Sequence, residues 1–195
     1  MAGKIAFDYD RAVGEATKLF WKNGYADTGL RDLLKAMGIG EGSFYNTIGS
    51  KKKLFLTCLG RYEETVVADR MRALNEPGTA AEGIREFFRM ILDCLDDPET
   101  PSRLCMLAAL STEEVLAESD LRTRADEGIT NLRAALRDRI AANRDVGALY
   151  ASFDPTVAAG ILTTYVQGLW RVALVSYNRA ESERQIEALL AGLGL

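Results

Sequence analysis

The 195-residue sequence contains no histidine. Histidine is the commonest general base in enzymes and the commonest protein ligand of metals, so its absence counts against most catalytic and metal sites. The three cysteines, Cys58, Cys94 and Cys105, are odd in number and lack CxxC spacing. This pattern indicates neither a disulfide framework nor a zinc site. We therefore expect no catalytic residue, no metal and no cofactor.

Long apolar runs are also missing, because no run approaches the ~18 residues of a transmembrane helix. The N-terminal stretch MAGKIAFDYDR is too short in apolar residues for a signal peptide. We expect a soluble, cytoplasmic protein with no membrane partner. No segment alternates with period two, and apolar residues recur at helical spacing along the chain. With 48% hydrophobic residues, this predicts an all-α fold of about nine helices.

Lysine does not occur beyond Lys53, and charge is divided unevenly along the chain. Residues 1–62 carry 10 Lys and Arg against 6 Asp and Glu, a net +4, whereas residues 63–195 carry 14 against 22, a net −8. A basic N-terminal third supplies the electrostatic attraction that nucleic acid requires, and an acidic remainder keeps the rest of the chain off the phosphates. The expected helices span residues 8–23, 28–37, 41–46, 50–74, 79–95, 101–117, 119–143, 154–174 and 182–192, with a turn near Gly147.

Residues 28–53 have the pattern of a helix-turn-helix. Apolar residues from Leu30 to Met37 fall at i, i+3, i+4 and i+7, and Thr28 is the expected N-cap. Gly38 then supplies the backbone freedom of a tight turn. Residues 41–46 form a second helix that crosses the first.

Three lysines follow directly. Ser50 is a good N-cap, so Lys51, Lys52 and Lys53 occupy the first turn of the next helix. Cations there oppose the helix dipole at roughly 0.3–1 kcal/mol each, whereas an external phosphate sits well at a helix N-terminus and pairs with lysine. Three consecutive cations in a turn that disfavours them favour a phosphate-binding role. The alternative is a solvated run of charge.

The segment LLKAMGIGEGSFYNTIGSKKKLF closely resembles the DNA-binding signature of TetR-type transcriptional repressors. The specific part of the resemblance covers roughly residues 8–62, and the remainder is similar in its layout of helices. Three positions depart from the pattern: Gly40 replaces an N-capping hydroxyl, Glu41 stands where a basic residue is common, and Ile48 replaces an aromatic residue. They bear on the strength and sequence of DNA binding. The matching positions are Gly38, Gly42, Ser43, Phe44, Tyr45, Ser50, Lys51, Leu54 and Phe55.

The resemblance implies a DNA-binding transcriptional regulator, a dimeric repressor of a pseudo-palindromic double-stranded operator. It implies a helix-turn-helix domain over residues 1–50, a connecting helix over 50–74, and a ligand-binding and dimerisation domain over 75–195. Ser43, Tyr45 and Lys51 would hold phosphates while the exposed face of the second helix reads bases. The expected DNA-binding residues are Thr28, Arg31, Glu41, Gly42, Ser43, Phe44, Tyr45, Asn46, Lys51 and Lys52.

In this family the last two helices pair with their symmetry mates as a four-helix bundle. The helix from Val157 to Leu174 carries an apolar stripe too wide for one neighbour, which favours the same arrangement here. The expected homodimer interface comprises Val157, Ile161, Leu169, Leu189 and Leu190.

A repressor also needs a signal that releases it from DNA. A small hydrophobic or aromatic effector is expected to bind among the C-terminal helices and to move the connecting helix over residues 50–74, which contacts both halves. Cys105 leaves two hypotheses open, a thiol that senses electrophiles or oxidants and an inert buried hydrophobe. Two alternatives to the repressor remain. One is an architectural DNA-binding protein without an effector, in which side chains would fill any cavity among the C-terminal helices. The other is an all-helical enzyme. The expected pocket residues are Tyr62, Val66, Phe87, Phe88, Ile91, Cys105, Leu132, Tyr165 and Trp170.

Overall fold

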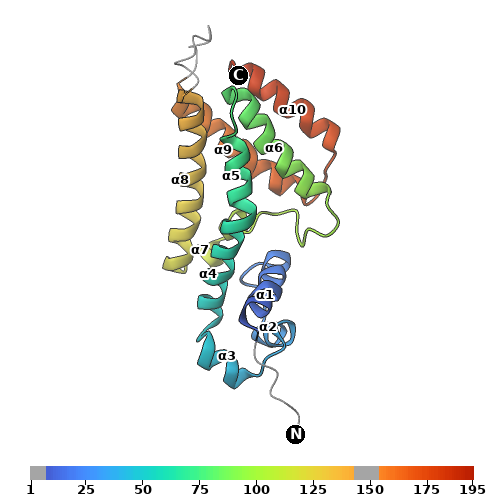
Figure 1. Cartoon of the computed structure of the whole chain (residues 1–195), viewed down its shortest axis with the longest axis vertical. Helices are drawn as coiled ribbons and strands as arrows, with labels where there is room; N and C mark the ends of the chain where they lie inside the picture. The colour runs from blue at the N-terminus through green and yellow to red at the C-terminus, as the bar shows by residue number, and fades with distance from the viewer. Residues whose placement is uncertain (1–7, 143–153) are drawn as a thin grey trace.

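A computed structural model describes residues 8–142 and 154–195 (Figure 1). Within these residues the fold has no strand and nine α-helices, counting the unbroken rod from Lys51 to Leu74 once, so the expected fold class is confirmed. The expected helix end near Asn143 and the turn at Gly147 lie outside the described residues. In the described part, no helix is long and apolar enough to cross a membrane.

Three short helices at the N-terminal end share one apolar centre. α1 (Tyr9–Asn23) begins at its Asp8 cap, as expected. α2 (Leu30–Met37) ends at Gly38, whose φ of 69° is left-handed and therefore suits glycine. α3 (Glu41–Thr47) follows after this turn. The centre is made by Ala12, Val13, Ala16, Phe20, Leu33, Met37 and Phe44, all buried.

A single long rod joins this unit to the rest of the chain. It consists of α4 (Lys51–Tyr62), a π-helical turn (Glu63–Val67) and α5 (Ala68–Leu74). In the π turn the N–H of Ala68 donates to the carbonyl of Glu63, five residues back, so one additional residue is fitted into the turn. The sequence pattern predicts the rod but not this turn. α4 packs on α1.

The remaining helices surround the other end of the rod. They are α6 (Ala80–Asp96), α7 (Glu113–Leu116), α8 (Ser119–Ala142), α9 (Pro155–Ala173) and α10 (Arg179–Gly192). α6 packs against α5 and α10, α8 packs against α9, and α7 packs at the start of α8. Figure 1 shows α8 running alongside the rod, with its start close to α4. Gly83 allows the close crossing of α6 over α5, because a Cβ there would lie 2.3 Å from the Leu74 carbonyl oxygen.

The helix expected over residues 101–117 is wrong in its first part. The chain there is irregular apart from one 3-10 turn and α7, although its apolar side chains are buried as expected. Side chains from other helices bond the carbonyls that a helix would satisfy internally. Trp21 Nε1 donates to the Leu104 carbonyl at 2.9 Å. Arg171 Nη2 donates to the Ala108 carbonyl at 3.0 Å. Tertiary packing therefore overrides the local preference for helix.

Two expected helix starts also move. Gly29, not Thr28, is the N-cap of α2. The Thr28 hydroxyl instead donates to the Gly24 carbonyl at 2.6 Å. α10 begins three residues before Ser182, because the Asn178 side chain accepts the hydrogen bond that caps it. The other expected caps are confirmed at Asp8, Ser50, Thr79 and Asp154.

Candidate DNA interface and effector pocket

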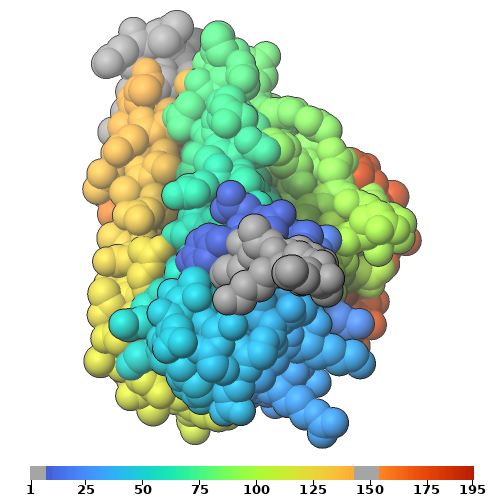
Figure 2. Space-filling view, turned by 60° about the horizontal axis from the view of Figure 1, so that its bottom comes forward, coloured from blue at the N-terminus to red at the C-terminus, as the bar shows by residue number. Residues whose placement is uncertain are grey.

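The helix α3 has one buried side and one exposed side. Phe44 is fully buried and holds α3 on the apolar centre. Tyr45 is 51% exposed, and its ring packs edge-on against Phe44 with centroids 5.4 Å apart. Glu41, Ser43 and Asn46 are exposed as well. Figure 2 looks onto this end of the molecule, where α2, α3 and the start of α4 form the surface. An exposed helix at the end of a molecule can enter a major groove.

The lysines that open α4 have different surroundings. Lys51 Nζ lies 4.6 Å from the centroid of the Tyr25 ring and donates to the Ala26 carbonyl at 3.3 Å. Burial lowers the pKa of Lys51, and attraction to Glu114 opposes this. Lys53 is exposed. Lys51 is therefore partly occupied by packing within the N-terminal unit, whereas Lys53 faces solvent.

Lys52 is held by two carboxylates from the C-terminal half. Its Nζ lies 3.1 Å from Asp120 Oδ2 and 3.3 Å from Glu118 Oε2. Hydrogen bonds to Asp120 and then Glu118 raise the pKa of Lys52. Asp120 lies in the first turn of α8 and Glu118 directly precedes that helix, whose start lies beside the lysine end of α4 in Figure 2. A lysine of the candidate DNA interface and the C-terminal half are thus directly joined by ion pairs.

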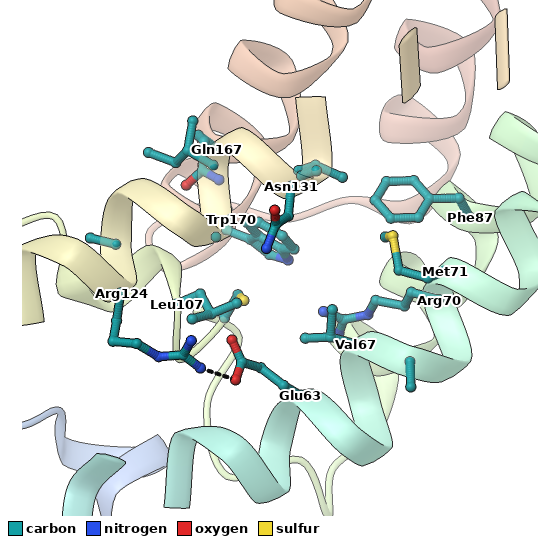
Figure 3. Close-up of a pocket in the computed structure, with 16 residues that line it drawn as sticks. Glu63, Val67, Arg70, Met71, Phe87, Leu107, Arg124, Asn131, Gln167 and Trp170 are labelled. Carbon is teal, nitrogen blue, oxygen red and sulfur yellow. Dashed lines mark hydrogen bonds and ion pairs between the residues drawn. The ribbon is translucent and has the colours of Figure 1, made fainter. Parts of the chain in front are cut away.

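A cavity of about 430 Å³ lies between the rod, α8 and α9 (Figure 3). Most of its wall is apolar. The carboxylate of Glu63, in the π turn, forms an ion pair with Arg124 of α8. Burial raises the pKa of Glu63, and attraction to Arg124 opposes this. The polar residues of the wall are Glu63, Arg70, Arg124, Asn131 and Gln167.

Arg70 contributes a buried charge to this cavity. It is 4% exposed, and no other charged residue among those described is buried. Its Nη1 donates to the Tyr62 hydroxyl at 3.3 Å. Its guanidinium carbon lies 5.7 Å from the centroid of the Trp170 ring. The cavity therefore combines apolar walls with a few fixed polar groups, Arg70 among them, an arrangement typical of ligand pockets.

Comparison with known proteins identifies the family. The family model "Bacterial regulatory proteins, tetR family" matches residues 13–58. YezE of Bacillus subtilis (strain 168), an uncharacterized HTH-type transcriptional regulator, is 31% identical over 143 residues, which are 73% of each chain. The chain belongs to the TetR family. It is a DNA-binding transcriptional regulator.

Two further relatives extend this result. The HTH-type transcriptional repressor ComR of Escherichia coli (strain K12) is 32% identical over 107 residues, 54% of this chain and 51% of ComR. A cysteine mutant of the TetR family regulator CifR, solved in complex with 26-bp double-strand operator DNA, has a TM-score of 0.85 at 28% identity. This match covers 95% of the present chain and 97% of CifR. The similarity to CifR thus includes both halves of the molecule.

In this TetR-family regulator, some of the residues predicted to contact DNA are buried and others are accessible. Thr28 and Phe44 are fully buried, so their side chains cannot serve as contacts and both predictions are corrected. Lys53 and Thr47 are not among the predicted residues, and both are exposed at the same end. Lys53 belongs to the lysine run, and Thr47 is one residue beyond the expected end of the helix. The remaining predicted residues are accessible: Arg31, Glu41, Gly42, Ser43, Tyr45 and Asn46 are exposed, and Lys51 and Lys52 are half-buried.

The cavity is lined by four of the nine residues predicted for the effector pocket. They are Phe87, Cys105, Leu132 and Trp170. The other five, Tyr62, Val66, Phe88, Ile91 and Tyr165, do not line it, and these predictions are corrected. On the rod, Glu63 and Val67 line the cavity, whereas Tyr62 and Val66 lie beside Trp21 of α1, whose ring centroid is 4.9 Å from that of Tyr62. Arg70 was missed because nothing in the sequence period marks it as buried.

Of the residues predicted for the dimer interface, some are exposed on the single chain and others are buried within it. Val157 and Ile161 are exposed on α9, in line with the exposed Val172. Leu169 and Leu190 are buried within the single chain, so they are corrected to core residues. The last predicted position, Leu189, is half-buried.

Proposed function

We propose that the protein is a dimeric repressor of a pseudo-palindromic operator, released from DNA by a small molecule that binds in the cavity. The exposed face of α3 would read bases, and the lysines of α4 would hold phosphates. In this proposal residues 1–50 form the DNA-binding domain, residues 50–74 connect, and residues 75–195 bind effector and form the dimer. The protein would act in the cytoplasm, without catalysis. The observation that supports DNA binding most directly is the similarity to CifR, which was solved with operator DNA.

The exposed stripe on α9 supports the dimer. Val157, Ile161 and Val172 of this helix, and Val175 just beyond its end, are large apolar residues exposed on the surface of the single chain. Gly168 lies on the same helix, and a Cβ there would meet no atom within 4 Å. An apolar stripe of this kind usually marks an interface. In a two-fold symmetric dimer, the stripe of one protomer would pack against the same stripe of its partner, since a C2 interface is self-complementary.

The helix α8 supplies the coupling from effector to DNA. It contributes Arg124 and Leu132 to the cavity wall, and its first turn carries Asp120, which holds Lys52. A ligand that favours a different position of α8 therefore changes both the lysine contact and the spacing of the two α3 helices. By linkage, DNA must weaken ligand binding by the same factor.

The test is DNA release measured by fluorescence anisotropy of a labelled operator duplex. A panel of small hydrophobic and aromatic compounds should release wild-type protein. Leu132→Trp should bind DNA normally but resist release, because the indole fills the cavity. Thr130→Trp is the matched control, since Thr130 is exposed on the same helix and does not line the cavity; it should behave as wild type. Equal release of Leu132→Trp and wild type would contradict the assignment of the cavity.

Two of the remaining hypotheses, the thiol sensor and the architectural protein, give different results in the same assay. Release by oxidants in wild type but not in Cys105→Ser would support the thiol sensor, since Cys105 lines the cavity and is buried. Release by no compound across a broad panel would favour the architectural alternative, although an open cavity of about 430 Å³ supports an effector. For the enzyme alternative, no group of three His, Cys, Asp or Glu in the described ranges could hold a metal ion.

A further inference from the structure

Arg70 is buried, and the described residues give it no counter-ion. Among residues 8–142 and 154–195, no carboxylate lies within ion-pair distance of its guanidinium, whose contacts are the Tyr62 hydroxyl and the Trp170 ring. Buried charges in proteins are normally paired, because leaving water costs far more than one neutral hydrogen bond returns. An arginine cannot escape this cost by losing its proton. The described residues therefore supply no negative group to balance this charge.

The neighbouring groups cannot supply that anion. Burial raises the pKa of the Tyr62 hydroxyl well above its ordinary value, with Cys105 adding to the effect and Arg70 opposing it, so Tyr62 is a neutral phenol. Glu63 is the carboxylate in the cavity wall, and it is paired with Arg124. Figure 3 shows that pair on one side of the cavity, while the Arg70 guanidinium reaches toward the central space.

The rest of the wall defines the body of the ligand. Val67, Met71, Phe87, Leu107 and Trp170 give the cavity apolar and aromatic surfaces around Arg70. Of the five N–H donors of Arg70, one bonds Tyr62 within the described structure. The others are free to form the paired, charge-assisted hydrogen bonds that arginine makes with a carboxylate.

We infer that the effector is an organic acid: an aromatic or aliphatic body enclosed by the apolar walls, with its anionic group bound to Arg70. This inference rests on the proposed effector role of the cavity and narrows its ligand from hydrophobic compounds in general to amphiphilic anions. Neutral compounds of the same shape leave Arg70 unpaired and bind more weakly.

Two fluorescent probes that share one aromatic body test this directly. 8-Anilino-1-naphthalenesulfonate carries an anionic group, and N-phenyl-1-naphthylamine lacks it. Wild type should bind the sulfonate at least about tenfold more tightly than the amine, and Arg70→Met should lose about that factor for the sulfonate alone, the loss expected when a charged hydrogen bond is removed. Arg103→Met is the matched control. Arg103 also lies over an aromatic ring, at 5.2 Å from the Tyr177 centroid, but does not line the cavity.

A second readout separates ligand recognition from folding. Because Arg70→Met removes an unpaired buried charge, the variant should melt at or above the temperature of wild type when no ligand is present. Displacement of the sulfonate probe from wild type by 2-naphthoate but not by 2-naphthamide supports the inference without any variant. Equal affinity of wild type for both probes, or an unchanged sulfonate affinity in Arg70→Met, would overturn it. So would failure of wild type to bind either probe.

Parallel DNA-release measurements distinguish this inference from the proposed function. If the sulfonate binds through Arg70 but operator DNA stays bound, the anion site stands and the proposed coupling fails. If the neutral amine releases DNA and the sulfonate does not, the proposed function stands and the anion inference fails.

Discussion

Removing the carboxylates that hold Lys52 should strengthen DNA binding. In the double variant Glu118→Gln, Asp120→Asn, the lysine is free to meet a phosphate, and two negative charges leave the DNA-facing end. The contacts are 3.3 Å and 3.1 Å long, with all three side chains partly exposed. Exposed ion pairs are weak, because water and salt screen them. We therefore expect an affinity gain of only a few-fold for each freed Lys52.

The salt dependence of DNA binding gives a second and more precise expectation. Each additional lysine–phosphate contact steepens the slope of log K against log salt by about 0.9. A dimer with two freed copies of Lys52 should steepen it by up to about 1.8. Anisotropy of a labelled operator, measured from about 50 to 200 mM salt, gives both quantities.

A charge-matched control separates this effect from a change in net charge. The double variant Asp126→Asn, Asp138→Asn likewise removes two acids, both from α8, but leaves the Lys52 contacts intact, and it should change the slope little. Adding Lys52→Ala to the first variant should cancel its gain. If the two double variants have the same affinity and salt slope, the ion pairs of Lys52 with Glu118 and Asp120 do not affect DNA binding.

Three further predictions concern stability, assembly and thiol chemistry. Gly83→Ala should lower the free energy of unfolding in urea by about 1–3 kcal/mol, since its Cβ would lie 2.3 Å from the Leu74 carbonyl, whereas Gly160→Ala, with open space around it, should not. Val172→Asp should convert the dimer into a monomer in analytical ultracentrifugation at micromolar concentration, and a wild-type monomer would contradict the interface. Burial raises the pKa of Cys58 to about 11, so at about pH 8 it stays protonated and should react with a thiol reagent far more slowly than the half-buried Cys94.

The N-terminal helices could be predicted because their signals are local. Leu33 and Met37 recur at the helical period, and Gly38 ends the helix in a conformation that suits glycine. Ser50 caps the rod through a hydrogen bond that spans three residues. Each of these features depends on neighbours in the sequence, so the sequence alone contains the information.

The irregular segment around Leu104 could not be predicted for the opposite reason. Its apolar residues predict a buried helix, and burial is confirmed. The helix is replaced by hydrogen bonds from Trp21 and Arg171, 83 and 63 residues away in the chain. No local pattern carries that information.

The cavity wall was predicted only in part because apolar character does not show which side of the rod a residue faces. Tyr62 and Val66 lie beside Trp21 of α1, and Glu63 and Val67 line the cavity. Arg70 lies beyond the π turn and looks like an ordinary surface arginine in the sequence. Its burial follows from packing against distant residues such as Trp170.

The most direct test of the account is selection of duplexes from a random pool by the purified protein, followed by sequencing. The account predicts enrichment of an inverted repeat whose half-site centres lie one helical turn apart, about 34–36 Å. It also predicts that Asn46→Ala shifts the preferred bases, whereas Tyr45→Phe weakens binding to all sequences alike. Enrichment of a sequence without two-fold symmetry, or no enrichment at all, would contradict a dimeric repressor that reads DNA through α3.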